Sequence, residues 1–378
     1  MNSRILLVTN DFGPRAGGIE TFVIGLLERV GSKGIGSRGV GSKGIVVYTS
    51  RQDGDESYDR DWLAKYGIEV IRDRSKILLP TPRVIGKLRK LIRSREIEVI
   101  WFGAAAPLGL AARWLRIGSV KRVVALTHGH EVWWSKVPPF SLLMREIGKH
   151  IDCLGYLGDF TGKAISRVVP SEKLIKIAPG IDTRHFQPHE KKKSNPTIIS
   201  VGRLVHRKGQ DRLVEALAII KEEVPDVQLI FVGEGPHRKE LNRLIKKHNL
   251  HGSVKFLGRI SYQNLPKYLS MGDIFAMPSR SRLFGLEVEG LGIVYLEASS
   301  CALPVIGGSS GGAPDAVIHG ETGYVVDGED VREIAARCIE LLKDETLRLR
   351  MGKRGREWVE SDWQWEIWSE KFNELLRK

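Results

Sequence analysis

The sequence has few cysteines and no long apolar stretch. Its three cysteines, Cys153, Cys301 and Cys338, are scattered, and no spacing of Cys or His predicts a zinc site. This usage favours a reducing cytoplasm over a secreted, disulfide-bonded class of protein. No segment approaches the ~20 consecutive apolar residues that a membrane-spanning helix needs. The first apolar run, Ile5–Thr9, ends in polar residues and therefore predicts a buried strand and not a signal peptide.

Positive charge is concentrated in the first half of the chain. The formal net charge is +14, and residues 1–187 hold 30 Lys and Arg against 18 Asp and Glu, which leaves +12 there and +2 in the remainder. Such asymmetry predicts an acidic surface or substrate on one side of the protein. No nucleic-acid-binding motif accompanies the charge, so we expect an anionic membrane surface and no nucleic acid. The sequence leaves the oligomeric state open.

Short apolar runs alternate with helical patterns along all 378 residues. This alternation predicts an α/β protein with two doubly wound parallel sheets. We place the boundary between residues 187 and 188, inside the Pro-rich and charged stretch Phe186–Pro196, which gives domains 1–187 and 188–361. A last helix, about Asp362–Leu376, is expected to return to the first domain, which adds residues 362–378 to it. The predicted strands are Ile5–Thr9, Ile45–Thr49, Glu98–Phe102, Arg122–Leu126, Thr197–Val201, Val227–Val232, Val254–Leu257, Ile274–Met277 and Pro304–Ile306.

The second half carries the most informative chemistry. Glu289 and Glu297 stand eight positions apart, and the segment between them, Gly290-Leu-Gly292-Ile-Val, opens a predicted helix. The free N–H groups at such a helix start can receive a diphosphate. Arg203 and Lys208 flank the turn after strand Thr197–Val201, where two cations can balance a diphosphate leaving group without a metal ion. Instead of binding a ligand, Arg203 and Lys208 could form surface salt bridges. Glu297 could likewise lie on a solvated helix face.

The first half carries two further motifs. Gly17 and Gly18 follow the first strand and precede the predicted helix Ile19–Val30, so their backbone N–H groups can approach an anion. A tight turn without a ligand is the alternative. His128, in Thr-His-Gly-His-Glu, follows strand Arg122–Leu126 at the sheet edge where ligands of α/β folds bind, although a lone histidine is more often structural. The repeat Gly31–Ile45 contains a formal GxGxxG, but no strand precedes it and no helix follows it, so a flexible basic loop is favoured.

These motifs together resemble the retaining glycosyltransferases of family 4 with the GT-B fold. Within that family, the stretches VTNDF, WFGAAAPL, THGHEV, RKGQD, DIFAMP, VEGLGIVYLEA and SGGAP are similar to those of the actinobacterial phosphatidylinositol mannosyltransferases. The resemblance implies two Rossmann-like domains that face a central cleft, with the C-terminal helix crossing back. It also implies a cytoplasmic enzyme associated with the membrane, which transfers a second mannose from GDP-mannose to a phosphatidylinositol mannoside. The transfer is expected to retain the anomeric configuration and to need no metal or other cofactor.

The resemblance implies a role for each matching residue. Glu289 and His128 would lie at the transferred sugar, Arg203 and Lys208 would bind the diphosphate, and Glu297 would hold the ribose. Other donor-binding positions are Gly17 and Gly18, the turn Arg259-Ile260, and the helix start Gly292, Ile293 and Val294. Four features depart from the family pattern and put the acceptor in doubt: Gly13, the repeat at 31–45, Trp133 and Leu283-Phe284.

The basic stretch Arg72–Arg95 is the candidate for the side of the protein that meets the acceptor, because it holds nine cations and one acid. Its helix, Pro82–Arg95, carries an apolar stripe for the core and a basic face that can lie on anionic lipid. The aromatic segment Trp133–Phe140 suits a headgroup boundary.

The sequence leaves four alternative functions open. They are a family-4 enzyme with a different nucleotide sugar or a soluble acceptor, a non-hydrolysing sugar-nucleotide epimerase, a nicotinamide-dependent dehydrogenase and a non-catalytic binding protein. The pairing of E-x7-E with Arg203 and Lys208 favours transfer over epimerisation. The GxGxxG inside the repeat argues against a dehydrogenase, and the presence of both Glu289 and His128 argues against a protein that only binds.

Overall fold

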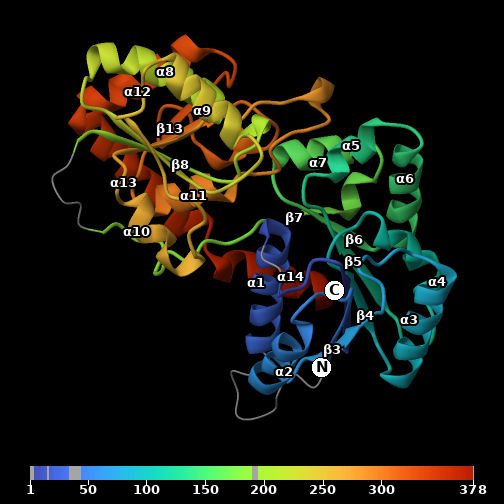
Figure 1. Ribbon diagram of the computed structural model, residues 1–378. Coiled ribbons are helices and arrows are strands. Elements are labelled where there is room, and N and C mark those ends of the chain that lie inside the picture. Colours follow the sequence, from blue (N-terminus) through green and yellow to red (C-terminus); the bar gives the residue numbers. More distant parts are fainter. Residues whose placement is uncertain (1–3, 15–16, 34–43, 190–194, 378) are drawn as a thin grey trace. The chain divides into compact units, whose positions relative to one another are not determined.

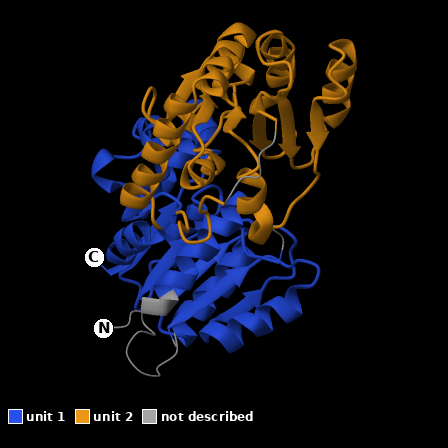
Figure 2. Ribbon diagram, turned by 90° about the vertical axis from the view of Figure 1, so that its left-hand side faces the viewer, with its two compact units in different colours: residues 1–180, 365–378 blue, residues 181–364 orange. Residues whose placement is uncertain are grey.

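The computed structural model describes residues 4–14, 17–33, 44–189 and 195–377, and the chain divides into two compact units. Unit 1 comprises Met1–Gly180 with Trp365–Lys378, and unit 2 comprises Ile181–Gln364. The elements follow one another along the chain as Figure 1 labels them, and Figure 2 colours the two units. Among the described residues, no helix combines the length and the apolar composition that crossing a bilayer requires.

The boundaries between the two units lie at slightly different residues from the domain boundaries predicted from the sequence. Residues 181–186 pack with unit 2, because Ile181 N donates to Trp363 O at 2.7 Å and Ser300 Oγ donates to the carbonyl of Phe186 at 2.6 Å. Phe186 itself is fully buried. At the other end, residues 362–364 stay with unit 2 and the return to unit 1 begins at Trp365. The change of unit therefore lies between Gly180 and Ile181, before Phe186, and residues 190–194 of the charged run lie outside the described residues.

Unit 1 contains a sheet of seven described strands in the order β3-β2-β1-β4-β5-β6-β7, with parallel pairing throughout. Because β1 lies between β2 and β4, the loops after β1 and β4 leave the sheet at its topological switch point, where ligands of such sheets bind. The strands are β1 Ile5–Thr9, β2 Ile45–Thr49, β3 Glu69–Arg72, β4 Val99–Phe102, β5 Arg122–Leu126, β6 Cys153–Tyr156 and β7 Leu174–Lys176.

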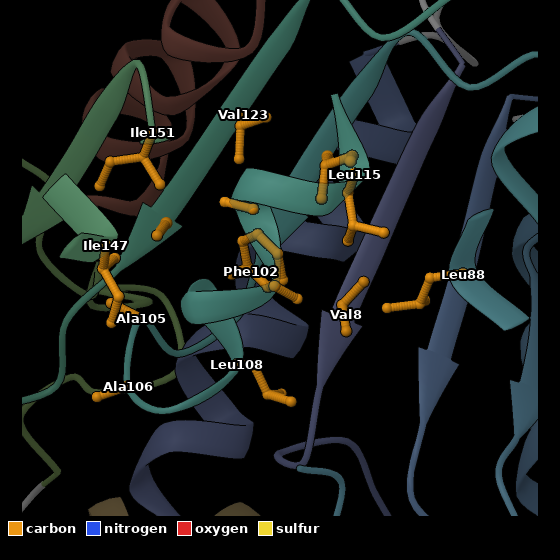
Figure 3. Packing of buried hydrophobic residues seen from close by; sticks show 14 of the residues in the cluster. Val8, Leu88, Phe102, Ala105, Ala106, Leu108, Leu115, Val123, Ile147 and Ile151 are labelled. Carbon is orange, nitrogen blue, oxygen red and sulfur yellow. The ribbon is translucent and has the colours of Figure 1, made fainter. Parts of the chain in front are cut away.

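Helices cover this sheet and bury its apolar strands. In α3, Val84, Leu88 and Ile92 recur every four residues and are all buried, which confirms the predicted core stripe. The side chains of Leu88 and Val8 of β1 point toward one another in the core (Figure 3). The helices are α1 Gly18–Lys33, α2 Asp55–Tyr66, α3 Pro82–Ser94, α4 Ala112–Leu115, α5 Glu131–Lys136, α6 Phe140–His150, α7 Asp159–Ile165 and α14 Trp365–Arg377.

The last helix, α14, packs against unit 1, as the sequence predicts for the C-terminus. Phe372 packs against Trp101 of β4 in a tilted arrangement with ring centroids 4.7 Å apart, and Arg122 Nε donates to Leu375 O at 2.6 Å. Trp365 fills the space beside Gly25 of α1, where an added Cβ would come within 2.4 Å of its ring. The helix starts three residues later than predicted, because residues up to Gln364 belong to unit 2.

Unit 2 contains a second parallel sheet, of six described strands in the order β10-β9-β8-β11-β12-β13. Its switch point lies between β8 and β11. The strands are β8 Thr197–Val201, β9 Gln228–Val232, β10 Val254–Phe256, β11 Ile274–Met277, β12 Val305–Gly308 and β13 Gly323–Val326. The helices are α8 Gln210–Glu223, α9 Arg238–Lys247, α10 Leu265–Leu269, α11 Ile293–Ser300, α12 Val331–Lys343 and α13 Glu345–Asp362. Two parallel α/β sheets confirm the predicted fold class.

Candidate active site

The loops at the switch point of unit 2 bring together the cations and carboxylates of the second half. The loop after β8 carries Arg203, Arg207 and Lys208, and the loop after β11 leads to Glu289. Arg280 N donates to Arg207 O at 2.8 Å, so the backbones of the two loops are bonded to one another. Gly209 (φ +69°) must be glycine, because an added Cβ would lie 1.9 Å from Pro278 O.

Glu289 lies at the centre of this cluster and is 7% exposed. Its Oε2 is 2.8 Å from Lys208 Nζ and accepts a hydrogen bond from Arg207 Nη1 at 2.6 Å. Burial by itself would raise the pKa of Glu289, but the attraction of Lys208 and then Arg207 outweighs burial and holds the pKa below its usual value. Glu289 is therefore ionised at neutral pH and pairs with two cations, the buried Lys208 and the partly exposed Arg207.

The backbone around Glu289 is fixed by the Ser-Gly-Gly-Ala-Pro segment after β12. Ser310 Oγ accepts a hydrogen bond from Glu289 N at 3.2 Å, and Gly312 N donates to Glu289 O at 2.9 Å. Gly311, at φ +57°, and Gly312 could not carry a side chain, because an added Cβ would approach the backbone of residues 289 and 290 within 2.3 Å. Because the two backbones approach so closely, glycine is required at both positions of the Ser-Gly-Gly-Ala-Pro segment. The sequence alone assigns no role to this segment.

Arg203 and Arg207 follow the same strand but have different surroundings, and of the two only Arg203 was predicted from the sequence. Arg203 is exposed, and its guanidinium has no carboxylate within ion-pair distance among the described residues, so the surface salt bridge considered for it is absent there. Nothing in the sequence singles out Arg207, yet it is Arg207 that shares Glu289 with Lys208. Its partner stands 82 positions away, so the pairing could be found from the fold but not from spacing along the chain.

The helix after Glu289 begins at a glycine, as predicted. Gly292 (φ +79°) precedes Ile293, the first residue of α11, and no side chain caps the helix. The N–H groups of Ile293 and Val294 have no acceptor within the helix and remain available to an anion, whereas Tyr295 N donates to Gly292 O at 2.9 Å. The helix is held to β11 by the buried hydroxyl of Tyr295, which donates to Met277 O at 2.7 Å. Gly292, Ile293 and Val294 therefore lie at an uncapped helix N-terminus, beside the loop that carries Glu289.

Glu297 lies in the second turn of α11, as the spacing predicts, and is largely buried. Burial raises its pKa from 4.5 to about 7. Among the described residues no cation stands within ion-pair distance of it. A half-protonated carboxyl group in such a place can accept hydrogen bonds from hydroxyl groups of a ligand, and the solvated helix face considered for it is excluded by its burial.

We expect Glu297→Gln to stabilise the folded protein at alkaline pH. Because the folded pKa lies above the unfolded one, the folded state keeps a proton that the unfolded state releases between pH 4.5 and about 7, and stability falls as pH rises through that window. Above it the ionised form costs on the order of 3 kcal/mol, which the neutral amide avoids. Guanidinium unfolding at pH 8 should show a gain of about 1–3 kcal/mol that shrinks by pH 5. The exposed matched control Glu222→Gln should show none, and an unchanged or lower stability of Glu297→Gln at pH 8 would contradict this reading.

Unit 1 places His128 directly after β5. Its ring Nε2 lies 2.5 Å from Gly103 O, and because a carbonyl only accepts, Nε2 carries the hydrogen and Nδ1 is left as an acceptor. Its backbone N donates to Oε2 of the fully buried Glu131 at 2.9 Å. Burial lowers the pKa of His128, so the ring is neutral at physiological pH. A neutral imidazole with a free Nδ1 suits a hydrogen bond from a sugar hydroxyl better than proton donation.

A carboxylate cluster near His128 has no predicted counterpart. Burial first, and then the negative charge of Glu20, raises the pKa of Asp11 from 3.8 to about 6. Asp11 follows β1 and the fully buried Glu131 begins α5, with its Oε1 3.2 Å from His130 Nε2. Asp11 lies between β1 and Gly17, in the stretch VTNDF, and no role was predicted for it from the sequence. Gly17 itself lies one residue before α1 and accepts a hydrogen bond from Thr21 N at 2.9 Å, while residues 15–16 lie outside the described residues.

Arg259 and Ile260 follow β10, and Arg259 is exposed. Gly13 precedes a cis proline, and the ring of Tyr58 fills the place where a Cβ would lie. Leu283 and Phe284 have positive φ angles and are 62% and 107% exposed, so the departure from glycine leaves two strained apolar residues on the surface. Most of the repeat at 31–45 lies outside the described residues.

Comparison with known proteins agrees with this geometry. A family model described as Glycosyltransferase Family 4 matches residues 16–185, and one described as Glycosyl transferases group 1 matches residues 182–358. The chain is 40% identical to the GDP-mannose-dependent alpha-(1-6)-phosphatidylinositol monomannoside mannosyltransferase of Mycobacterium tuberculosis, over 99% of this chain and 98% of that protein. It is equally similar, over the same shares, to a GDP-mannose-dependent monoacylated alpha-(1-6)-phosphatidylinositol monomannoside mannosyltransferase of Corynebacterium glutamicum.

Solved structures agree on the fold. Sucrose-phosphate synthase from Thermosynechococcus elongatus superposes with a TM-score of 0.79 at 22% identity, covering 99% of this chain and 98% of that one. Anabaena HepE in complex with UDP gives a TM-score of 0.78 at 18% identity, covering 99% of both chains. The chain therefore belongs to glycosyltransferase family 4, has the GT-B fold, and groups within that family with the phosphatidylinositol monomannoside mannosyltransferases.

Proposed function

We propose that this protein transfers an α-mannosyl residue from GDP-mannose to the 6-hydroxyl of a mannose on phosphatidylinositol monomannoside, forming the dimannoside. The observation that carries the proposal is the buried Glu289–Lys208–Arg207 cluster beside the uncapped N-terminus of α11. Such a cluster supplies positive charge and free N–H groups to a diphosphate. The names of the relatives that are 40% identical over nearly the whole chain supply the donor and the acceptor.

In this proposal the donor diphosphate replaces Glu289 on the cations. Lys208, together with the unpaired Arg203 and the N–H groups of Ile293 and Val294, balances the charge that grows on the diphosphate as the anomeric bond breaks. The released carboxylate of Glu289 is then free to contact the donor sugar. Glu297 accepts hydrogen bonds from the ribose, and Arg259-Ile260 lies against the base. The protein supplies this charge balance itself, so the transfer needs no metal ion or other cofactor.

The acceptor hydroxyl attacks on the face from which the diphosphate departs. The bond between the anomeric carbon and the phosphate oxygen breaks, the bond to the acceptor oxygen forms, and the hydroxyl proton passes to the leaving diphosphate, so configuration is retained. Neutral His128 accepts a hydrogen bond from the transferred sugar through Nδ1, as its tautomer allows. No strong base is required, which agrees with a histidine that is buried and uncharged.

The donor and acceptor are tested together by a matrix of GDP- and UDP-sugars against phosphatidylinositol, its monomannoside and soluble mannosides, with linkage analysis of each product. We expect one productive pair, GDP-mannose with the monomannoside, and an α-(1-6) product. Transfer from a UDP-sugar, or to a soluble acceptor at equal efficiency, would overturn the assignment and favour the alternative of another family-4 activity.

We also propose that unit 1 binds the cytoplasmic face of the membrane through a basic surface on and before α3. Of the nine cations in Arg72–Arg95, four form ion pairs. Arg83 and Lys87 pair with the buried Asp73, Arg72 pairs with Asp59, and Arg95 pairs with Glu69. Among the described residues the other five have no carboxylate within ion-pair distance. They are Arg74, Lys76, Arg89, Lys90 and Arg93.

The shape and the apolar residues of this surface favour lipid. Arg89, Lys90 and Arg93 line an open hollow of about 570 Å³ on α3. In the segment that leads into the helix, Ile77 is 67% exposed and Leu79 is 50% exposed. Apolar side chains beside unpaired cations match an anionic headgroup layer over acyl chains, whereas nucleic acid would leave Ile77 and Leu79 without a partner.

Vesicle flotation tests this surface. Each cation near an anionic membrane contributes about 1 kcal/mol, so Lys90→Ala combined with Arg93→Ala should weaken binding to anionic vesicles by about 30-fold. The matched control changes Lys246 and Lys247, two exposed lysines of α9 in unit 2, to alanine and should float like the unmodified protein. Equal recovery with neutral and anionic vesicles would end the membrane proposal.

A further inference from the structure

Three side chains outside the Glu289 cluster converge in unit 2. They are His206, the first residue of the 3-10 turn η3 (His206–Lys208), Asp211 in the first turn of α8, and His237 directly before α9. One ligating atom from each lies within 4.8 Å of the other two. The centroids of the two imidazole rings are 3.7 Å apart. His206 and Asp211 follow β8 and His237 follows β9, all at the carboxyl edge of the sheet, and their spacing along the chain matches no metal motif.

His237 supplies an independent sign of a missing ligand. The residue is 4% exposed, and its Nε2 has no hydrogen-bond partner in the described part of the chain. The closest carboxylate oxygen, Asp211 Oδ2, is 3.9 Å away, beyond hydrogen-bonding distance. A buried ring nitrogen without a partner costs free energy, so such atoms are rare in folded proteins and call for an explanation. A ligand between His237 and Asp211 would provide one.

Asp211 is held in the manner of a carboxylate that ligates a metal. Arg280 Nη1 donates to Oδ1 at 2.8 Å and Nη2 donates to Oδ2 at 2.7 Å, which fixes the plane of the carboxylate. Ligating carboxylates are commonly oriented by such outer hydrogen bonds, and each oxygen keeps a second lone pair. Part of the positive charge of Arg280 is offset by Glu329, whose Oε1 is 3.0 Å from Arg280 Nε.

We propose that His206, Asp211 and His237 bind a divalent transition-metal ion of the Zn²⁺ class. Two imidazole nitrogens and one carboxylate oxygen suit zinc, cobalt or nickel, whereas the nearby guanidinium and the shortage of oxygen ligands disfavour magnesium and calcium. The ligating atoms must close to about 2.0–2.2 Å from the ion. His206 is exposed on a short turn, so it can move to complete the site.

The ion would join the turn that carries Lys208 to the starts of α8 and α9. Its role is to hold the loops at this edge together, and it takes no part in neutralising the diphosphate. The proposal therefore stands or falls independently of the proposed transferase activity. A metal that binds the folded state and not the unfolded chain also raises thermal stability by mass action.

The test uses untagged, chelator-treated protein titrated with ZnCl₂ in a calorimeter, with MgCl₂ in a parallel titration. We expect one Zn²⁺ per chain, no Mg²⁺ binding at this site, and a higher thermal midpoint with zinc. The exposed residue His206 can be replaced without disturbing the core, so His206→Ala should keep its far-ultraviolet circular dichroism and lose at least tenfold in zinc affinity. His251→Ala, an exposed histidine of the same unit, is the matched control and should bind like the unmodified protein.

Cobalt substitution provides a second, spectroscopic test of the proposed metal site. Co²⁺ bound by imidazole and carboxylate gives visible absorption that reports its coordination, and this absorption should appear at one equivalent and be absent in both His206→Ala and His237→Gln. Failure of the unmodified protein to bind zinc stoichiometrically, or equal zinc affinity in His206→Ala, would overturn the proposal.

Discussion

Replacing Lys208 by alanine is expected to lower kcat/KM for mannosyl transfer by about 10²–10³-fold, the usual loss when one buried group that stabilises developing charge is removed. Lys208 is 9% exposed and touches Glu289, so its charge acts where water screens it little. The same variant should bind GDP more weakly, because the cation contacts the diphosphate in donor and product alike. Steady-state kinetics and GDP titration measure the two effects.

The Lys208 result is interpretable only if the protein remains folded and the effect is local. Circular dichroism should be unchanged, since Arg207 still holds Glu289 after the substitution. The matched control is Lys267→Ala, an exposed lysine of α10 in the same unit, which should keep full activity. Transfer by Lys208→Ala at the unmodified rate would remove this residue from its proposed role.

Replacing Glu289 by alanine is expected to lower the rate of transfer by at least about 10²-fold while making GDP binding several-fold tighter. The reason is competition, because Glu289 pairs with Lys208 and Arg207, the cations to which the diphosphate binds in the proposed function. Without this carboxylate, the diphosphate meets both cations unpaired. The contact of Glu289 with the donor sugar is lost, however, and with it the stabilisation of the transition state.

Glu289→Ala and Lys208→Ala should therefore move GDP affinity in opposite directions while both lose transfer. Glu240→Ala, which breaks a surface ion pair of α9, is the matched carboxylate control and should change neither quantity. A fall in GDP affinity for Glu289→Ala comparable to that for Lys208→Ala would mean that Glu289 only supports the fold of the loop. In that case the competition argument fails.

Much of the fold could be predicted because the buried strands are short, continuous apolar runs between helical patterns. All nine predicted strands are present, with ends shifted by no more than two residues. Four others were not predicted, and their composition explains why. β3 and β7 are half-buried edge strands with charged residues, and β6 and β13 contain glycine, so none shows the continuous apolar signal of a central strand.

The candidate site could be predicted only in part, since its contacts join residues distant in sequence. The E-x7-E spacing places Glu289 before a helix and Glu297 within it, and the structure agrees. The role of Arg207 depends on a pairing across two loops, and the burial that raises the pKa of Glu297 depends on packing. The convergence of His206, Asp211 and His237 likewise depends on two connections, after β8 and after β9, that meet at one edge of a sheet. Spacing along the chain carries none of this information.

The central claim is that protein cations and helix N–H groups, without a metal ion, neutralise the diphosphate of a sugar nucleotide. Calorimetric titration of the chelator-treated protein with GDP-mannose tests it most directly. The account predicts binding of one GDP-mannose per chain in excess chelator, with an affinity that addition of Mg²⁺ leaves unchanged and that Lys208→Ala reduces. Absence of binding until a divalent ion is added would contradict it.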